Sequence, residues 1–297
     1  MIDQREPSRF DSTSWHTLSA DRQFSKIERI LWIIYNLVNK SFPRVGVDKK
    51  IKVLKFRLKE DELNELWGDI AEMRSPARTL CDLFWMSLPW KALLNEMGRV
   101  SILEIGCGSG VYGRLLEKLL GESFKQYVGV DIEANDQWKI YSSNASHFKI
   151  GRACDAYKFL PDSNLIITQS ALEHFYEDFL YFRQVSSYVL ANKSPILQVH
   201  VIPAASCIKT FPWHGVREYT PRTISKITRL FGIETKVYLF SLGGSGCNRI
   251  HRKFITWPNL KHGVDLRRTY KMKYRRDLLS AIVSDFNRTA KTLLFMP

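Results

Sequence analysis

The sequence contains no hydrophobic run long enough to cross a membrane. Its most apolar short segment, Ile30–Val38, falls far short of the roughly 18 residues that a membrane-spanning helix needs. The opening stretch MIDQREPSRFDSTSW has early acidic residues and no apolar run, so no secretory signal is predicted there. Internal repeats and low-complexity segments are also absent, so neither a repeat architecture nor a compositionally biased linker is expected.

Cysteine is scarce and scattered. The five cysteines form no Cys-x-x-Cys pair, and an odd number cannot all be joined to one another. This pattern favours reduced thiols in the cytoplasm over a disulfide framework or a structural zinc site. With 45% hydrophobic and 25% charged residues, the composition is that of an ordinary globular protein. We therefore predict a cytoplasmic protein with no bound metal.

Acidic residues are few near the end of the chain. The net charge is +14, and residues 249–297 hold 12 basic but only 3 acidic side chains. The run RRTYKMKYRR (267–276) favours an anionic partner, whether a nucleic acid, a membrane surface or a phosphorylated substrate. A solvated basic helix face is an equally good interpretation. Tyr270 and Tyr274, interleaved with Lys and Arg, would also suit stacking on RNA bases.

The first third of the chain has the pattern of a helical cap. Its apolar residues recur at helical spacing, Ser75-Pro76 is a helix-start signal, and Pro89 should bend or break the last helix. The apolar face within residues 24–38 has three open interpretations: core, a dimer face, or a helix lying in a membrane interface. The expected helices are 22–41, 59–73 and 77–97.

From Val100 onward, short apolar runs alternate with helical stretches. Such alternation is typical of βαβ units, in which helices cover both faces of a parallel sheet. Two final runs, 234–240 and 250–257, flank a glycine-rich loop and are expected to form an antiparallel strand pair. The predicted fold class is therefore α/β, with a mostly parallel sheet whose last strand is antiparallel. The other expected strands are 100–105, 126–132, 164–169 and 196–202, and the expected helices are 111–120, 175–190 and 221–231.

The stretch ILEIGCGSGVYG (102–113) places a glycine loop directly after the first of these strands. Read from Gly108, it matches G-x-G-x-x-G, the turn of dinucleotide-binding proteins. That reading forces two extra residues into the strand end. A reading from Gly106 instead meets Val111 where glycine or alanine is needed. Neither reading suits a dinucleotide well.

A third interpretation of the glycine loop requires no change in where the strand ends. Gly106, Gly108 and Gly110 let the backbone approach a ligand closely, and Glu104 places a carboxylate at the strand end. A carboxylate is poorly suited to a pyrophosphate but suits a ligand that carries an ammonium and a sulfonium group. With its E-x-G-x-G-x-G pattern, the segment resembles the first motif of class I S-adenosylmethionine (SAM)-dependent methyltransferases. The resemblance implies a Rossmann-like fold and SAM as cofactor.

Two later segments extend this resemblance. The run VGVDIE ends an expected strand at Asp131, where the family has an acid that binds the ribose hydroxyls, and Ile132 completes this cofactor-binding set. The run ACDAYKFLP resembles a D-A-x-x-L-P segment with one extra residue before Leu160, which implies that Asp155 contacts the adenine amino group and the amide of Ala156 reads the ring. Alone, Asp131 would also suit an NAD ribose and Asp155 a helix N-cap. The order and spacing of the motifs carry the inference.

The run NLIITQSALEHF (164–175) is similar to the fourth motif of small-molecule methyltransferases, including the quinone-biosynthesis (type 11) branch. This implies that Gln169 and Ser170 lie beside the methionyl group of SAM. The resemblance covers residues 101–190 well and extends more loosely to Trp257. Residues 1–75 and 260–297 match no part of the family. The predicted organisation is a helical N-terminal cap (1–75), a SAM-binding methyltransferase domain (76–258) and a basic helical C-terminal extension (259–297).

Methyl transfer to an oxygen benefits from a base whose pKa is near the working pH, and histidine meets this need most readily. Three histidines lie after or near the ends of expected strands and are candidate catalytic residues: His174, His200 and His214. Packing is the alternative role for His174 and His200, and an ordinary folded surface loop is the alternative for His214. The loop FPWHGVREYTP also offers aromatic and cationic groups that could bind a substrate, namely Trp213, Arg217 and Tyr219.

We therefore predict transfer of the SAM methyl group to a small-molecule acceptor, with S-adenosylhomocysteine as product. O-methylation of a sugar, a cell-envelope intermediate or a secondary metabolite is the favoured reaction. The alternatives are an RNA-modifying methyltransferase, suggested by the basic end of the chain, and a non-catalytic scaffold subunit with the same fold. No N-P-P-Y or D-P-P-Y sequence occurs, which disfavours methylation of flipped DNA bases. Peripheral membrane contact and the oligomeric state are left open.

Overall fold

The computed structural model describes residues 12, 18–19, 22–43, 45–192 and 194–287. The chain divides into two compact units, each made from three separate stretches. The sequence-based segments 1–75, 76–258 and 259–297 run across these divisions and remain a prediction about domain organisation. Unit 1 comprises Met1–Asp48, Pro89–Pro203 and Trp213–Thr235, and unit 2 comprises Lys49–Leu88, Ala204–Pro212 and Lys236–Pro297.

Unit 1 is built on a five-stranded sheet in the order β4-β3-β2-β5-β6, with every neighbouring pair parallel. The α/β Rossmann-like fold predicted from the sequence is confirmed. Its elements are α1 (Lys26–Ser41), α4 (Trp90–Met97), β2 (Val100–Ile105), α5 (Val111–Leu120), β3 (Phe124–Asp131), α6 (Gln137–Tyr141), β4 (Ser146–Ile150), β5 (Leu165–Gln169), α7 (Asp178–Ala191), β6 (Leu197–Val201) and α8 (Pro221–Thr228), with short 3-10 turns at Gly121–Ser123, Ala153–Lys158 and Leu172–His174.

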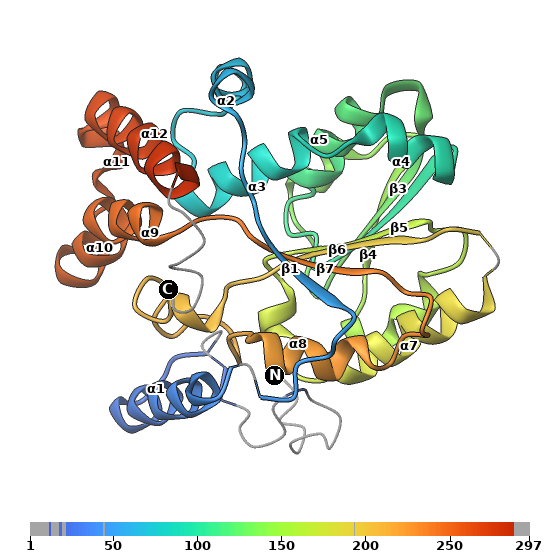
Figure 1. Ribbon diagram of the computed structural model, residues 1–297, viewed down its shortest axis with the longest axis horizontal. Helices are drawn as coiled ribbons and strands as arrows, with labels where there is room; N and C mark the ends of the chain where they lie inside the picture. The colour runs from blue at the N-terminus through green and yellow to red at the C-terminus, as the bar shows by residue number, and fades with distance from the viewer. Residues whose placement is uncertain (1–11, 13–17, 20–21, 44, 193, 288–297) are drawn as a thin grey trace. The chain divides into compact units, whose positions relative to one another are not determined.

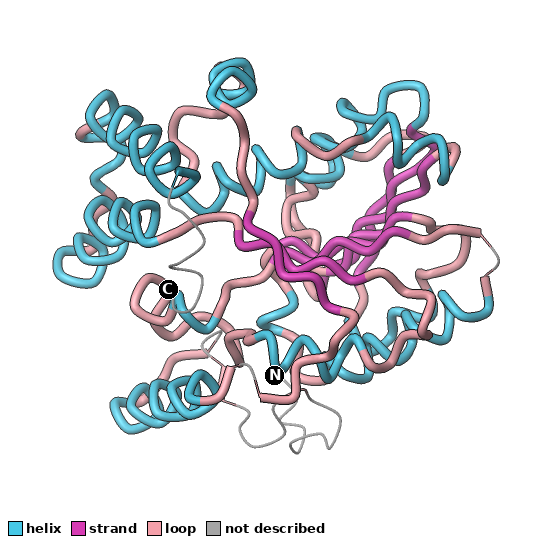
Figure 2. The backbone as a smooth tube through the Cα atoms, viewed as in Figure 1, coloured by secondary structure: helices cyan, strands magenta, loops and turns pink. Residues whose placement is uncertain are grey.

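Helices cover both faces of this sheet. Helices α4 and α5 lie on one face, and α7 and α8 lie on the other (Figure 1). Every residue of β2 is buried, as expected for a central strand with helices on each side. One core cluster joins strand residues such as Leu103 and Ile166 to Val185 of α7 and Ile227 of α8. Figure 2 shows the strands running side by side as a twisted layer.

Strand β2 marks the point where the order of the strands reverses: the chain adds β3 and β4 on one side of β2 and then β5 and β6 on the other. It pairs with β3 on one side and with β5 on the other. In open α/β sheets the crevice at such a point, beyond the carboxyl ends of the strands, is where ligands bind. The segments that leave β2, β3 and β5 are therefore the first places to look for a functional site.

Local sequence signals account for the ends of several helices. Ser25 begins α1 with a capping box, because its hydroxyl accepts a hydrogen bond from the amide of Glu28, whose carboxylate accepts one from the amide of Ser25. The predicted start at Ser75-Pro76 is confirmed, since the Ser75 hydroxyl accepts from the amide of Arg78. The predicted break at Pro89 is confirmed as well, because one helix ends at Met86 and α4 begins at Trp90.

Helix α1 buries Trp32 but exposes most of its apolar stripe. Ile27 and Ile30 are 70% and 59% exposed, and Ile34, Leu37 and Val38 are exposed too. The core interpretation of this stripe is therefore wrong, whereas the dimer-face and membrane-interface interpretations remain predictions. Among the residues that the structure describes, no helix has both the length and the apolar character needed to cross a membrane.

Unit 2 holds the second, smaller set of elements. Its two strands pair with each other in parallel, from Ile51 opposite Val237 to Lys55 opposite Ser241. Phe56 packs edge-on against Phe84 and Phe286 in its core. The elements are β1 (Ile51–Lys55), α2 (Glu60–Trp67), α3 (Pro76–Met86), a 3-10 turn at Ala205–Cys207, β7 (Val237–Ser241), α9 (Ser245–His251), a π-helical turn at Arg252–Thr256, α10 (Trp257–His262), α11 (Leu266–Thr269) and α12 (Lys271–Asn287).

The predicted antiparallel strand pair at the end of the sheet is wrong. Residues 250–257 are helical, and the buried side chains Ile250 and Phe254, together with Pro258 just beyond them, recur every four residues. The helix is started from outside the local sequence: the carboxylate of Asp285 accepts hydrogen bonds from the amides of Gly246 and Cys247, at 2.9 and 2.8 Å. Strand β7 pairs with β1 and not with the five-stranded sheet, which is parallel throughout.

Candidate functional site

The glycine loop after β2 depends on backbone conformations that favour glycine. Gly106, Gly108 and Gly110 all have positive φ, at 77°, 52° and 80°. A Cβ on Gly106 would lie 2.3 Å from the Cβ of Ala171, and one on Gly110 would lie 2.5 Å from the ring of Phe148. A Cβ on Gly108 would meet nothing within 4 Å. Two glycines thus allow close packing, while the third leaves open space beside the loop.

Gly110→Ala is expected to destabilise unit 1 by about 2–4 kcal/mol, because the left-handed backbone and the displacement of Phe148 both cost free energy. Gly263→Ala is a matched control, since Gly263 has the same left-handed backbone, with a φ of 66° and a ψ of 21°, but no atom within 4 Å of the added Cβ. It should lose only about 1–2 kcal/mol. Urea denaturation measures both, and equal losses would contradict the packing argument.

Beneath the loop lies a buried polar pair. Glu104 is 1% exposed, and its Oε2 accepts a 2.6 Å hydrogen bond from the Tyr127 hydroxyl. Burial, together with the Glu104 carboxylate, raises the pKa of the Cys107 thiol and of the Tyr127 hydroxyl. These two groups therefore stay protonated at neutral pH. Glu104 therefore supports the loop from inside. A side chain this buried does not have the exposure that a direct contact with a ligand would require.

Asp131 holds the tip of the glycine loop. Its Oδ2 accepts a 2.7 Å hydrogen bond from the amide of Gly108, and its Oδ1 accepts one of 2.7 Å from the amide of Ile132. From another direction, the indole of Trp138 donates to the carbonyl of Gly108 at 2.7 Å and stacks on Phe148. The carboxyl ends of β2 and β3 are thus joined at one residue of the loop.

The remaining predicted adenine-side residues differ in exposure. Ile132 is 66% exposed, an unusual position for an apolar side chain that follows a buried strand, whereas Ala156 is fully buried. The carboxylate of Asp155 pairs with Lys158 at 3.1 Å and its side chain is 35% exposed. An apolar surface and a carboxylate that water can reach are therefore both present beyond β3 and β4.

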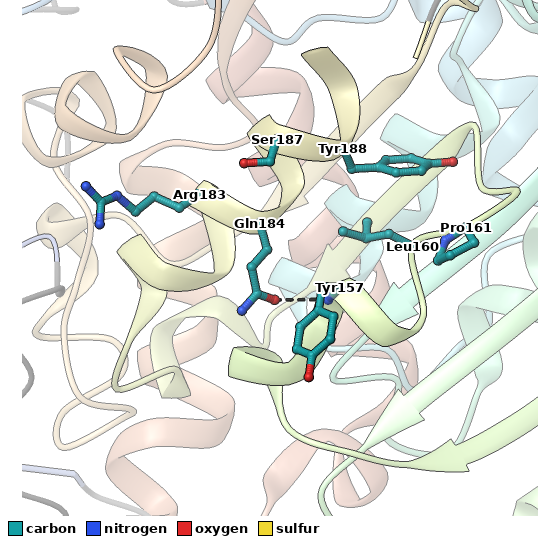
Figure 3. A pocket seen from close by; sticks show the side chains of 7 residues that line it. All are labelled: Tyr157, Leu160, Pro161, Arg183, Gln184, Ser187 and Tyr188. Carbon is teal, nitrogen blue, oxygen red and sulfur yellow. Dashed lines mark hydrogen bonds between the residues drawn. The ribbon is translucent and has the colours of Figure 1, made fainter. Parts of the chain in front are cut away.

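An open groove of about 420 Å³ lies between residues 157–161 and helix α7 (Figure 3). The amide of Tyr157 donates to Oε1 of Gln184 there, at 2.9 Å (Figure 3). None of the catalytic, cofactor-binding or substrate-binding residues predicted from the sequence lines it. We therefore do not include it in the candidate site. It is lined by Tyr157, Leu160, Pro161, Arg183, Gln184, Ser187 and Tyr188.

The chain leaves β5 through a constrained turn. Gln169 is 4% exposed, and Ser170 has a φ of 52°, which is uncommon for a residue other than glycine. The amide of Ser170 donates to the carbonyl of Val201 at 2.8 Å. Non-glycine residues in this conformation cluster at functional sites, where the surrounding structure holds the strain. The turn also brings Ala171 against Gly106.

Next to this turn, Glu173, His174 and His214 form a cluster. Glu173 is fully buried, and its Oε1 lies 3.2 Å from Nε2 of His214, whose side chain is 43% exposed. The rings of His174 and His214 meet edge to face, 4.8 Å apart. Two of the three predicted catalytic histidines are thus in contact. Glu173 was not predicted, although it adjoins His174 in the sequence.

Burial separates the third histidine from this cluster. The His200 ring packs edge-on against Phe182, and its Nδ1 lies 3.0 Å from the Thr168 hydroxyl. Burial lowers the pKa of His200 to about 4. The ring therefore stays neutral at physiological pH and fits the packing role that the sequence left open.

The loop that carries His214 folds tightly onto Glu173. The amide of Val216 donates to the Glu173 carbonyl at 2.7 Å, and a Cβ on Gly215 would lie 2.6 Å from that oxygen. Trp213 has a φ of 58°, and its ring stacks with the Arg29 guanidinium. Trp213 is the one predicted substrate-binding residue that keeps an exposed side.

Arg217 and Tyr219, the other two predicted substrate-binding residues, lie inside unit 1. Arg217 is fully buried and donates to the carbonyls of Phe175 and Tyr176, at 2.7 and 3.0 Å. Tyr219 donates to Asp178 at 2.7 Å, and Arg217 pairs with the same carboxylate at 3.3 Å. Side chains so enclosed are not expected to touch a substrate. They hold the loop against the start of α7.

Helix α1 supports the same loop from its buried side. The Trp32 indole donates to the carbonyl of Gly215 at 3.0 Å. Asn36 accepts from the amide of Glu218 at 3.0 Å, and Asn39 donates to its carbonyl at 2.8 Å. The sequence marks α1 only as amphipathic, and no local signal points to these contacts.

Glu218 is a buried carboxylate whose two oxygens have no hydrogen-bond partner among the described residues. Burial raises the pKa of Glu218 well above its usual range, an effect that Lys40 opposes and Glu173 reinforces. Because the folded-state pKa is raised, its stabilising contribution is complete below the unfolded pKa and is lost as the pH rises toward the folded pKa.

Glu218→Gln should therefore gain stability relative to the unchanged chain as the pH rises from about 5 to 8. The difference can grow by up to about 1.4 kcal/mol per pH unit, the maximum for one proton. Urea denaturation across this range in buffer with EDTA measures it. Glu117→Gln, at an exposed site on α5, controls for the lost charge. A difference that stays constant with pH would contradict the assignment.

The basic run near the end of the chain is used mainly within unit 2. Arg275 donates to the carbonyls of Ile70 and Trp67, at 3.1 and 2.8 Å. Arg267 pairs with Asp265 at 2.6 Å. Tyr274 is fully buried and donates to a carbonyl of unit 2, so it cannot stack on a nucleic acid base. These contacts favour the helix-face interpretation over an anionic partner. Residues 288–297 lie outside the described part.

No protein-family model and no curated protein matches this chain. Among solved structures, it is similar to a SAM-dependent methyltransferase of Archaeoglobus fulgidus (19% identity, 59% of this chain and 74% of that chain, TM-score 0.34). It is also similar to a protein described as a sarcosine dimethylglycine methyltransferase from Galdieria sulphuraria (12% identity, 76% of this chain and 91% of that chain, TM-score 0.38). A third similar structure is described as the complex of a methyltransferase activator of Haloferax volcanii with a methyltransferase (13% identity, 57% of this chain and 73% of that chain, TM-score 0.36). Scores this low do not establish a shared activity, so the function rests on the residues of the site itself.

Proposed function

We propose that this chain is a SAM-dependent methyltransferase that methylates a hydroxyl group of a small-molecule acceptor. The observation that carries the proposal is the glycine loop, with open space at Gly108 and a direct hydrogen bond to Asp131. This combination occupies the carboxyl ends of β2 and β3, where a Rossmann-like sheet binds its ligand.

The residues present fit SAM. Gly108 leaves room for a ligand to approach the backbone. Each oxygen of Asp131 accepts one amide hydrogen bond, and a carboxylate offers about four acceptor positions, so it retains capacity for two ribose hydroxyls. Exposed Ile132 offers an apolar face for a purine ring, and Asp155 an acceptor for its amino group.

When bound, SAM supplies a methyl group on a positively charged sulfur. Gln169 and Ser170, at the end of β5, would bind the methionyl part. Glu173, His174 and His214 follow on the same segment and its neighbouring loop, so they are the groups we assign to the acceptor hydroxyl and its proton. Trp213, which borders them, would form part of the acceptor wall. A sugar, cell-envelope or secondary-metabolite hydroxyl remains the proposed acceptor class.

The RNA alternative rests on the basic run alone and is weakened, because Tyr274 is buried and much of that run is paired. The remaining rivals are a dinucleotide-dependent enzyme and a scaffold that binds no cofactor. Calorimetric titration with SAM, S-adenosylhomocysteine and NAD⁺ separates them. We expect one SAM site per chain with a Kd between about 1 µM and 1 mM, the usual range of enzyme affinities, and no NAD⁺ binding. Binding of NAD⁺ alone, or of none of the three, would contradict the proposal.

A further inference from the structure

We infer that Glu173, His174 and His214 form a binding site for a divalent transition-metal ion. Each residue offers one ligand atom, and the three atoms lie within 4.8 Å of one another. Oε1 of Glu173 and Nε2 of His214 are already 3.2 Å apart. Two imidazoles and one carboxylate at such spacing are a recurrent ligand set for transition metals in proteins.

The burial of Glu173 gives a second, independent reason. Its side chain is fully buried, and Oε2 has no hydrogen-bond partner among the described residues. A buried carboxylate oxygen without a partner is costly, and such charges are normally paired or bound to a metal. A cation at the cluster would offset the buried charge of Glu173.

The surrounding backbone fixes the ligands before any ion binds. The hydrogen bond from Val216 and the close approach of Gly215 lock the loop onto the Glu173 carbonyl. The Trp32 indole holds Gly215 from α1. His214 is thus held next to Glu173 by its own neighbours in the chain. Preorganisation of this kind is what a metal site needs from its supporting residues.

The ligand types select the ion. Imidazole nitrogen suits Zn²⁺, Mn²⁺, Co²⁺ and Fe²⁺, whereas Mg²⁺ and Ca²⁺ prefer all-oxygen sites. Three protein ligands leave at least one coordination position for water or a substrate oxygen, as catalytic metal sites do. We therefore expect a first-row transition ion that keeps an open position on the partly exposed side of His214.

The role of the ion rests on the proposed function. A hydroxyl bound to the ion would lose its proton more readily, because the cation stabilises the oxyanion. The O–H bond breaks and the proton passes to water. The oxygen then bonds to the methyl carbon, while the carbon–sulfur bond breaks and its electron pair stays on sulfur. The acceptor class is therefore a hydroxyl compound small enough to reach the open position.

The test is metal binding by the full chain, without a polyhistidine tag, after dialysis against EDTA. Titration with Co²⁺ is followed by visible absorption and titration with Zn²⁺ by calorimetry. We expect one equivalent per chain and binding at least about 100-fold weaker in His214→Ala and Glu173→Gln, the loss expected for a missing ligand. His147→Ala, at an exposed histidine of β4, is the control and should bind like the unchanged chain.

Absence of stoichiometric binding by the unchanged chain would overturn the inference, as would unaltered affinity in His214→Ala. If Glu173→Gln fails to fold, His214→Ala still decides, because that side chain is partly exposed. SAM titrations of the same samples keep the two proposals distinct. SAM binding without metal binding would overturn the metal site alone, and metal binding without SAM binding would overturn the proposed function alone.

Discussion

Asp131→Ala is expected to weaken SAM binding by at least about 100-fold. Two hydrogen bonds from ribose hydroxyls to a carboxylate would be lost, and hydrogen bonds to charged groups contribute about 1.5–3 kcal/mol each. The variant also releases the amide of Gly108, which Asp131 holds at 2.7 Å, so the loop loses its preformed conformation. Both effects act in the same direction, and calorimetric titration with SAM measures their sum.

Two further variants separate these effects. Asp131→Asn retains one carbonyl oxygen that can accept from Gly108, and we expect a smaller loss, about 10-fold. Asp136→Ala removes a carboxylate of the same β3–α6 region that is 97% exposed, and it should leave the affinity unchanged. Unchanged SAM affinity in Asp131→Ala would remove the central support of the proposed function.

The part of the fold that carries the glycine loop could be predicted from the sequence in full. Strand β2 and helix α5 have the bounds expected, 100–105 and 111–120. Their signals are local: a continuous apolar run ends at a glycine-rich turn, and a helical pattern follows at once. Where neighbouring residues settle the conformation, the pattern in the sequence is sufficient.

Elements determined by distant contacts could not be predicted in the same way. Residues 250–257 alternate enough to suggest a strand, but Asp285 starts a helix just before them through contacts 38 and 39 positions away. Strands β1 and β4 were missed because Ile51–Lys55 and Ser146–Ile150 are short and largely exposed, so neither shows a clear apolar alternation.

In the candidate site too, some residues are positioned by local sequence signals and others by contacts with distant parts of the chain. The glycines, Asp131 and His174 follow strands directly, so topology alone brings them to the sheet edge. Whether a loop side chain faces outward is a property of packing, which is why Arg217 and Tyr219 were assigned to a substrate although both are buried. The prediction of no metal rested on cysteine spacing and remains untested, whereas the inferred metal site rests on the carboxylate of Glu173 beside two histidines.

Glu173→Gln should reduce kcat by about 10²–10⁴-fold, the range that assistance to proton removal contributes to catalysis. Glutamine keeps the volume of the buried side chain but loses the charge that faces His214 at 3.2 Å. SAM affinity depends on the glycine loop and should stay within about threefold. The measurement is formation of S-adenosylhomocysteine with a panel of phenol and sugar hydroxyl acceptors.

A purely structural role for Glu173 predicts a different outcome. Loss of folding would lower the concentration of active protein and leave kcat per SAM-binding site unchanged, so activity is normalised to the sites counted by calorimetry. Added Zn²⁺ or Mn²⁺ should raise the activity of the unchanged chain after EDTA treatment and have little effect on Glu173→Gln. Glu117→Gln should respond to metal like the unchanged chain. Full turnover per site in Glu173→Gln would show that its buried charge serves packing alone, and another group would then have to assist the loss of the acceptor proton.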